Sequence, residues 1–170
     1  TLTYSWFMEA RTLHAPLDVL SAANRPQGIE IATLTTFDIP ALAVLTLEAY
    51  DDAVTPEALL ETSEELRLTF EGAFGDTTED SFVGAWDGGT LVGAILVVRE
   101  SPWDDVPNGP FVVDLIVAPD YRRRGIATAL VSEVASRCTH WGFDSLALRL
   151  DARHGGAREL YSMLGFEEIA

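Results

Sequence analysis

A buried strand that leads through an arginine-rich turn into a long helix constrains the fold more than any other segment of the chain. Residues 111–118 are apolar except for Asp114, a composition typical of a strand that is covered on both faces. Pro119 ends this strand, and apolar side chains then recur at helical spacing from Gly125 to about Trp141. The segment therefore predicts a sheet with helices packed against it, as in α/β and α+β proteins.

Hydrophobic periodicity divides the rest of the chain into strand and helix patterns. Strands are predicted at 29–34, 82–86, 91–99, 111–118 and 145–150, with a short strand at 166–169. Helices are predicted at 38–50, from 55 to about 74, at 125–141 and at 157–164. The first two helices begin with a capping residue and an early proline. No repeat or linker splits residues 29–170, so we treat them as one domain preceded by an N-terminal extension at 1–28.

Composition narrows the classes of function. The chain has 170 residues, a single cysteine and a formal net charge of −16. One cysteine excludes an internal disulfide and a multi-cysteine metal site, so we expect no metal. The acidic balance disfavours nucleic-acid binding, which needs basic residues against phosphates, and it suits either a cationic acceptor or simply a well-solvated surface. Without an apolar run of membrane-spanning length or a signal-peptide pattern, we expect a cytoplasmic protein that does not contact the membrane.

The turn between the buried strand and the long helix has the composition of an anion site. Gly125 lets the backbone approach a ligand closely, and the free N–H groups of the first helical turn attract negative charge. Arg122, Arg123 and Arg124 precede this glycine and add forked positive charge suited to phosphate. The patterns G-x-x-x-x-G-K-[ST] and G-x-G-x-x-G are absent. We expect a pyrophosphate or similar anion here, the alternative being an exposed turn whose arginines only solubilise the helix start.

Two motifs resemble the signatures of the GNAT superfamily of acetyl-CoA-dependent N-acetyltransferases. The first is Arg122-x-x-Gly125-x-Ala127, preceded by Val117-Ala118-Pro119, and the second is Ala157-Arg158-Glu159-Leu160-Tyr161-Ser162-Met163-Leu164-Gly165-Phe166. The order of elements from Ile29 to Phe166 resembles the family as well. The resemblance implies a mixed, mostly antiparallel central sheet flanked by helices on both faces, with acetyl-CoA as the cosubstrate.

The resemblance also implies which residues hold acetyl-CoA. Backbone groups of Leu115, Ile116 and Val117 would pair with the pantetheine arm, and an N–H there would hold the thioester carbonyl as an oxyanion hole does. The pyrophosphate would lie on Arg122, Arg123, Arg124, Gly125, Ile126, Ala127 and Thr128. Ala157 would adjoin the CoA arm. Three residues before it, where the family often has an asparagine that bonds this arm, the chain has His154. That imidazole would keep the contact, relay a proton or lie on the surface.

Acetyl transfer needs an acid and a base. By resemblance, Tyr161 would protonate the departing CoA thiolate, since a phenol stays protonated at neutral pH; its alternative is a place in the core. Asp114 is the best candidate for the base that takes the amine proton, although it could equally bind an acceptor cation or lie at a strand edge. By family analogy, Tyr50, Asp51 and Asp52 are candidates for binding the acceptor, or they simply solvate a helix end.

The sequence leaves the acceptor and one end of the fold open. The amine could belong to a small molecule, a protein N-terminus or a lysine. The second class of function is a catalytically degenerate domain that binds acyl-CoA as a sensor or interaction module. Tyr4–Arg11 resembles the strand that usually closes the family's sheet, and we predict that it pairs near 166–169, within one chain or by exchange across a homodimer. A tail of a preceding domain and an ordinary extension are the alternatives.

Overall fold

The central sheet is assembled from strands that come from both ends of the chain. The computed structural model describes residues 11–20, 25–101, 103–150 and 157–169. The strands are β1 (Arg11–Pro16), β2 (Ile29–Thr33), β3 (Phe82–Asp87), β4 (Thr90–Val98), β5 (Phe111–Val117), β6 (Ser145–Leu150) and β7 (Glu167–Glu168). They form a 7-stranded sheet in the order β2-β3-β4-β5-β6-β1-β7. Neighbours are antiparallel except for β5 and β6, which confirms the expected mixed, mostly antiparallel sheet.

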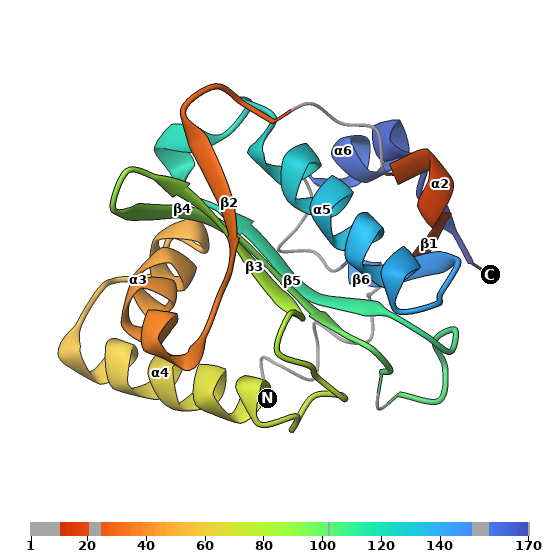
Figure 1. Cartoon of the computed structure of the whole chain (residues 1–170). Coiled ribbons are helices and arrows are strands. Elements are labelled where there is room, and N and C mark those ends of the chain that lie inside the picture. The colour runs from red at the N-terminus through yellow and green to blue at the C-terminus, as the bar shows by residue number, and fades with distance from the viewer. Residues whose placement is uncertain (1–10, 21–24, 102, 151–156, 170) are drawn as a thin grey trace.

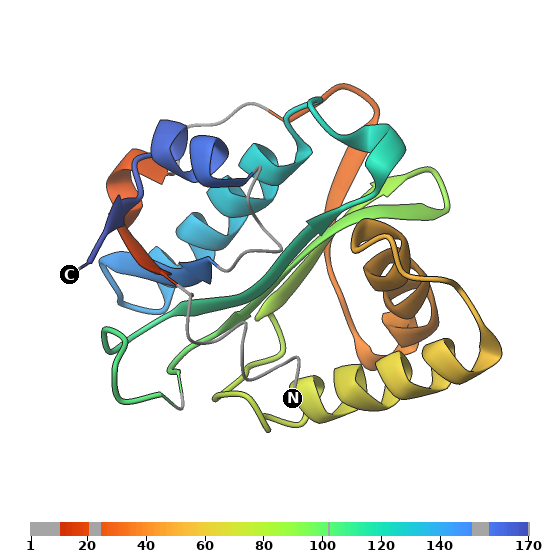
Figure 2. The same cartoon turned by 180° about the vertical axis from the view of Figure 1, so that it is seen from behind.

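Helices cover both faces of this sheet, as predicted, and each face has its own hydrophobic core. α3 (Ile39–Ala49) and α4 (Pro56–Phe70) lie on one face, whereas α5 (Ile126–His140), α6 (Ala157–Leu164) and the short α2 (Leu17–Leu20) lie on the other (Figures 1 and 2). Successive side chains of a strand point to opposite faces. In β4, Ala94 and Leu96 accordingly join the core beneath α3, and Ile95 and Val97 join the core beneath α5.

The helix starts follow the capping signals in the sequence. The Thr55 side chain accepts a hydrogen bond from the Ala58 amide at 3.1 Å, and Pro56 opens α4. These are the roles that a capping hydroxyl and an N1 proline have in general. α5 begins close to the sheet because β4 carries a glycine beneath it: a Cβ on Gly93 would lie 2.8 Å from Ile126 Cγ2. This close contact fixes the first turn of α5 relative to β4 and β5.

Two irregularities open the middle of the sheet. The parallel strands β5 and β6 pair only at Phe111↔Ala147 and Val112↔Leu148, so the rest of β5 has no β6 partner. On its other side, the ladder between β4 and β5 shifts register between Leu96 and Val97, as at a β-bulge. The gap and the bulge lie next to each other, at the centre of the molecule.

The N-terminal part of the chain closes the sheet with a strand at Arg11–Pro16. β1 lies between β6 and β7, with Leu13 opposite both Leu148 and Glu168. Of the predicted strand Tyr4–Arg11, the described part of the chain includes only Arg11, which is the first residue given for β1, and residues 4–10 lie outside it. In the structure the pairing occurs within one chain. The division into an extension at 1–28 and a domain at 29–170 stays a prediction.

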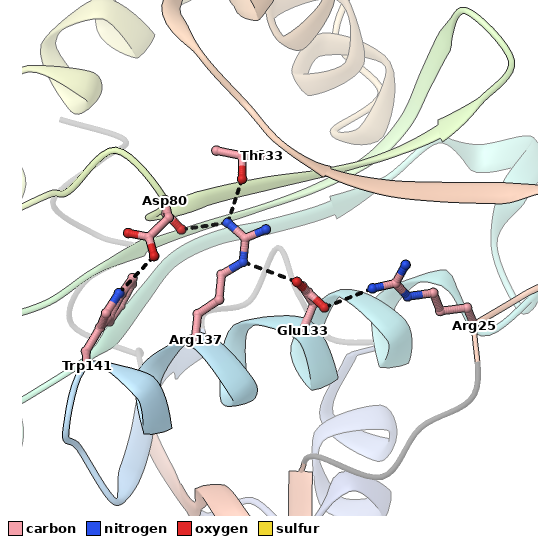
Figure 3. Close-up of polar contacts among 6 residues, drawn as sticks. All are labelled: Arg25, Thr33, Asp80, Glu133, Arg137 and Trp141. Atoms are coloured by element: carbon pink, nitrogen blue, oxygen red, sulfur yellow. Dashed lines mark hydrogen bonds and ion pairs between the residues drawn. The ribbon is translucent and has the colours of Figure 1, made fainter.

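A network of hydrogen bonds and ion pairs connects α5 to the edge strand β2 and to the loop before β3. Arg137 of α5 donates to Thr33 Oγ1 at the end of β2 (2.8 Å) and to the Asp80 carbonyl ahead of β3 (2.9 Å). Glu133 accepts from Arg137 Nε at 3.3 Å and from Arg25 at 3.1 Å (Figure 3). Through these contacts α5 is held to β2, to the loop before β3 and to the segment that leads into β2.

Candidate active site

The turn between β5 and α5 has a backbone that directs free amide groups outward. Two of its residues, Arg123 (φ 63°) and Gly125 (φ 81°), adopt left-handed conformations. Glycine is required at 125 by this φ rather than by lack of space, because a Cβ there would meet only Pro26 Cγ, at 3.9 Å. Gly125 is the N-cap of α5 and offers no side chain to the first turn. The N–H groups of that turn lack intrahelical partners and lie at the positive end of the helix dipole, so the turn is a candidate anion site.

A cavity of about 510 Å³ lies beside this turn. The end of β5, the turn, the start of α5, the helix α6 and the C-terminal end of α3 all contribute to its wall. The lining residues are Ala49, Tyr50, Leu115, Ile116, Val117, Tyr121, Arg122, Arg123, Gly125, Ile126, Ala127, Thr128, Leu160 and Tyr161. One space thus joins the predicted pantetheine strand, most of the predicted anion loop, the predicted acid and one predicted acceptor residue.

Three lining residues had not been singled out from the sequence. Leu160 precedes Tyr161 in the second motif, so its place at the site could have been inferred from the motif. Tyr121 lies in the turn itself and donates from its hydroxyl to Asp87 Oδ2 at 2.6 Å. Ala49 takes part through its carbonyl, as described below, and no sequence pattern marks a backbone group of this kind.

The edge of β5 that lies away from β4 borders the cavity. The Ala118 amide donates to the Val92 carbonyl of β4 at 2.8 Å. Because the N–H and C=O groups of successive residues alternate between the two sides of a strand, the groups of Leu115 and Val117 point away from β4. Within the described part of the chain, β6 pairs with β5 only at Phe111 and Val112, and the Val117 carbonyl accepts from Arg122. The N–H and C=O of Leu115 and the N–H of Val117 are therefore candidates for pairing with an extended ligand.

Tyr161 brings a buried phenol to this cavity from α6. Its side chain is buried, and its ring packs edge-on against Phe166 with the ring centroids 5.5 Å apart. Burial, together with the nearby negative charge of Asp114, raises the pKa of Tyr161 well above its ordinary value of 10. The hydroxyl therefore carries its proton throughout the neutral range and can donate it.

Asp114 and Tyr50 form a hydrogen-bonded pair next to the bulge in β5. Asp114 lies opposite Leu96, where the register shifts. The hydroxyl of Tyr50, the residue that follows α3, donates to Asp114 Oδ1 at 2.5 Å, and both side chains are partly buried. Tyr50 lines the cavity whereas Asp114 is not among its lining residues. The carboxylate nevertheless lies close enough to influence the ionisation of Tyr161, so the Tyr50–Asp114 pair and Tyr161 belong to one site.

The three arginines of the turn have different surroundings. Arg122 and Arg123 line the cavity. The Arg122 guanidinium donates to two backbone carbonyls, that of Val117 at 3.2 Å and that of Ala49 at 2.6 Å. Arg124 does not line this cavity; its Cζ lies 4.9 Å from the centre of the Tyr121 ring, and it borders a separate hollow of about 330 Å³. That all three bind phosphate, as their charge beside the helix start and the family resemblance imply, stays a prediction; their side chains lie in different places around the left-handed residue Arg123.

The remaining candidates lie at the margin of the site or beyond the described residues. Asp51 and Asp52 are exposed and do not line the cavity. His154 lies outside the described part of the chain, and Ala157 is the first residue of α6.

The described residues contain neither a cluster of metal ligands nor a helix that could span a membrane. Among residues 11–20, 25–101, 103–150 and 157–169, His, Cys, Asp and Glu form no group of three that could bind a metal ion. Within the same residues, no helix is both long and apolar enough to cross a bilayer.

Solved structures share this architecture at low sequence identity. The chain superposes on a GCN5-related N-acetyltransferase from Sphaerobacter thermophilus with a TM-score of 0.67 and 24% identity, over 94% of this chain and 48% of that one. It therefore spans about half the length of that protein. The ribosomal-protein-S18-alanine N-acetyltransferase from Escherichia coli matches with a TM-score of 0.61 and 20% identity, over 84% of this chain and 79% of that chain.

A third structure pairs the same fold with a cofactor analogue. The aminoglycoside N-acetyltransferase AAC(6')-Iy, solved with a CoA-based bisubstrate analogue, matches with a TM-score of 0.61 and 20% identity, over 84% of this chain and 92% of that chain. Among curated proteins, none matches the sequence significantly. A family model described as the acetyltransferase (GNAT) family matches residues 45–166, which is more than half of the chain. The chain belongs to the GNAT family of acetyltransferases.

Proposed function

We propose that this domain moves the acetyl group of acetyl-CoA to a primary amine by direct attack, with Tyr161 as the general acid. The observation that carries the proposal is a single cavity lined both by the anion-binding turn at Gly125 and by a buried tyrosine whose pKa is raised. An anion site next to a proton donor fits a cosubstrate that combines a pyrophosphate with a thioester.

The residues present fit each part of acetyl-CoA. The N–H groups of the first turn of α5, with the charge of Arg123, would hold the pyrophosphate. The pantetheine amides would pair with the N–H and C=O of Leu115 and with the N–H of Val117, as a strand adds to a sheet edge, while the Val117 carbonyl keeps its bond from Arg122. One N–H of that edge would hold the thioester oxygen and the negative charge that develops on it.

The chemistry then requires two proton transfers. The amine nitrogen attacks the carbonyl carbon, a C–N bond forms, and the C–S bond breaks. Asp114 takes the proton from the nitrogen, directly or through a water molecule, and Tyr161 gives its hydroxyl proton to the departing sulfur. The Tyr50–Asp114 hydrogen bond at 2.5 Å supports this assignment because it keeps a carboxylate oriented beside the cavity.

Direct attack is favoured over an acyl-enzyme because the chain lacks a suitable thiol nucleophile. Its one cysteine, Cys138, lies on α5 and is fully buried. Burial raises the pKa of the Cys138 thiol to about 12, so almost none of it is the reactive thiolate at neutral pH.

The test begins with binding and proceeds to turnover. Calorimetry with acetyl-CoA establishes binding, and release of the CoA thiol reports transfer to an amine panel. The panel contains an aminoglycoside and a peptide beginning with alanine, chosen from the names of the two structural neighbours, together with spermidine and a lysine peptide. If the protein binds acetyl-CoA but transfers acetyl to no acceptor of the panel, the result would favour the alternative function, a catalytically degenerate domain that binds acyl-CoA as a sensor or interaction module.

Replacing the proposed acid is the sharper experiment. We expect Tyr161→Phe to lower kcat by about 10²–10⁴-fold and to leave acetyl-CoA affinity nearly unchanged, because it removes one proton donor and little volume. Met163→Ala, on an exposed part of the same helix, serves as the control and should keep wild-type kcat. An unchanged kcat in Tyr161→Phe, with chemistry shown to be rate-limiting, would remove Tyr161 from the mechanism.

A further inference from the structure

Arg122 connects three parts of the site through its guanidinium. Nε donates to the carbonyl of Val117, the last residue of β5, at 3.2 Å, and a terminal nitrogen donates to the carbonyl of Ala49, the last residue of α3, at 2.6 Å. A guanidinium is planar and forked, so two such bonds fix the distance between their acceptors. A single side chain of the turn between β5 and α5 thereby links the end of α3 to the end of β5.

The Ala49 carbonyl is a favourable place for such a bond. The last carbonyls of a helix have no intrahelical donor and carry the negative end of the helix dipole. A charged donor binds them more strongly than a neutral one. The next residue is Tyr50, whose hydroxyl donates to Asp114 Oδ1 at 2.5 Å. The contacts therefore run from Arg122 through Ala49 and Tyr50 to the carboxylate of Asp114.

We propose that Arg122 is a positioning residue for the acceptor side of the reaction rather than a phosphate ligand. By holding the Ala49 carbonyl at the end of β5, it fixes Tyr50, which in turn orients the Asp114 carboxylate toward the incoming amine. The inference rests on the proposed function for the chemical step that it supports. It assigns the turn at 122–128 two tasks: the backbone and Arg123 bind the anion, and Arg122 aligns the residues that receive the proton.

Two substitutions of adjacent arginines separate these tasks. Arg122→Lys keeps the positive charge but cannot span both carbonyls. Arg123→Met removes a charge from the same turn without touching the bonds that Arg122 makes. We expect Arg122→Lys to keep acetyl-CoA Kd within about twofold and to lower kcat/KM for the best acceptor of the panel by about 10–100-fold, the size expected of a misplaced reacting group. Arg123→Met should weaken acetyl-CoA binding several-fold and leave the acceptor KM unchanged.

A double-mutant cycle tests whether Arg122 acts through Tyr50. Tyr50→Phe removes the hydroxyl that holds Asp114. If Arg122 acts by placing this hydroxyl, Arg122→Lys adds nothing to the loss caused by Tyr50→Phe, because the two changes remove one effect. Multiplied losses in the double variant would overturn the proposal, as would an acetyl-CoA Kd that rises in Arg122→Lys as it does in Arg123→Met.

Hydrogen exchange supplies a readout that does not depend on turnover. The amides of Tyr50, Asp51 and Asp52 are bonded to carbonyls of the last turn of α3. They should exchange faster in Arg122→Lys and at the wild-type rate in Arg123→Met, and equal rates in all three proteins would overturn the proposal. A wild-type protein that transfers acetyl to no acceptor would defeat the proposed function, whereas this measurement would still decide whether Arg122 holds the end of α3.

Discussion

Tyr161 and Cys138 are both buried protic side chains, but only one of them can take part in the reaction. Burial raises the pKa of each. Tyr161 lines the cavity, where a hydroxyl that keeps its proton is useful to a leaving thiolate. Cys138 belongs to the core between α5 and the sheet. Its place on the cavity wall is what suits Tyr161 to donate a proton, whereas burial and a raised pKa keep Cys138 inert.

The inertness of Cys138 can be measured directly. With a pKa of about 12, roughly one thiol in ten thousand is ionised at about pH 8, and burial hinders access further. We expect the native protein to react with a disulfide reagent at pH 8 far more slowly than the same protein in denaturant. A native rate close to the denatured rate would show that Cys138 is accessible, and it would reopen the question of an acyl-enzyme.

Gly125 is the residue on which the anion site depends most. It needs glycine because of its φ of 81°, and it borders the N–H groups that would hold the pyrophosphate. We expect Gly125→Asp to abolish measurable acetyl-CoA binding by calorimetry, since it adds a negative charge and a strained backbone at the phosphates. Gly88→Asp is the matched control. Gly88 likewise has a positive φ, 59°, and a Cβ there would have no neighbouring atom within 4 Å. Equal losses in the two variants would mean that backbone strain, not the anion site, is responsible.

At the scale of elements, sequence periodicity predicts α3, α4, α5, α6 and the long strands, although α4 ends at Phe70 rather than at about residue 74 and the short α2 is not predicted. The predicted starts of α3 and α4 at 38 and 55 fall one residue before the observed ones, at the capping positions. What periodicity does not reveal depends on pairing between distant segments. The divergence of β5 from β6, the bulge between Leu96 and Val97 and the insertion of β1 are properties of the sheet as a whole.

The same limit applies to the site. The two motifs predict that the turn and Tyr161 meet, and the cavity contains both. They do not predict that Arg122 binds carbonyls while Arg124 lies over the Tyr121 ring. Those roles depend on where α3 ends and on the left-handed backbone at Arg123, and neither is marked by a residue type that requires it.

The network on α5 gives a prediction about how elements hold together. Asp80 accepts from Trp141 Nε1 at 3.1 Å, and its carbonyl accepts from Arg137 (Figure 3). Partial burial opposes the ionisation of Asp80, but hydrogen bonds from Thr78 and Trp141 outweigh it and lower its pKa. We expect Arg137→Met to lower the free energy of unfolding by about 2 kcal/mol, because it removes several charged hydrogen bonds, two of which are partly buried. Urea denaturation measures this change.

The control for Arg137→Met is the same substitution at an exposed arginine. Arg67 on α4 pairs with Glu64 and Glu71, and all three side chains are about half exposed. Such exposed pairs contribute little, so Arg67→Met should leave the free energy of unfolding nearly unchanged. If the two substitutions cost the same, the network of Figure 3 has no special part in holding α5 to the sheet.

At the scale of the whole molecule, the strand β1 from the N-terminal part of the chain pairs with the strands β6 and β7 from its C-terminal part. β1 pairs with β6 along its full length and with β7 at Leu13 and His14. Leu13 and Ala15, with Leu17 and Leu20 of α2, are buried in the core that also contains Tyr161 and Phe166. Because β7 follows α6 directly and rests on β1, the strand from the N-terminal side supports the helix that carries the proposed acid.

This arrangement predicts that β1 can be moved to the other end of the chain. The Ile169 amide donates to the Thr12 carbonyl at 2.9 Å, so the end of β7 lies beside the start of β1 and the two are antiparallel. A permuted chain would begin at Arg25, continue to Ala170, pass through an Asn-Gly turn and end with residues 11–20, so that the two-residue turn joins opposite positions of the register that Leu13 and Glu168 set. The turn suits a tight hairpin. We expect this protein to melt within a few degrees of the wild type and to bind acetyl-CoA with unchanged Kd.

The control is the chain that begins at Arg25 and lacks residues 11–20 altogether. It loses four buried side chains from the core, at about 1.5–3 kcal/mol for each large one, and it leaves β6 with an open edge. We expect it to be unfolded or insoluble. A stable truncated chain with full acetyl-CoA affinity would show that β1 is dispensable. An unfolded permutant would show that the link from α2 to β2 matters beyond delivering the strand, since every strand pair of the sheet can still form in the permuted order.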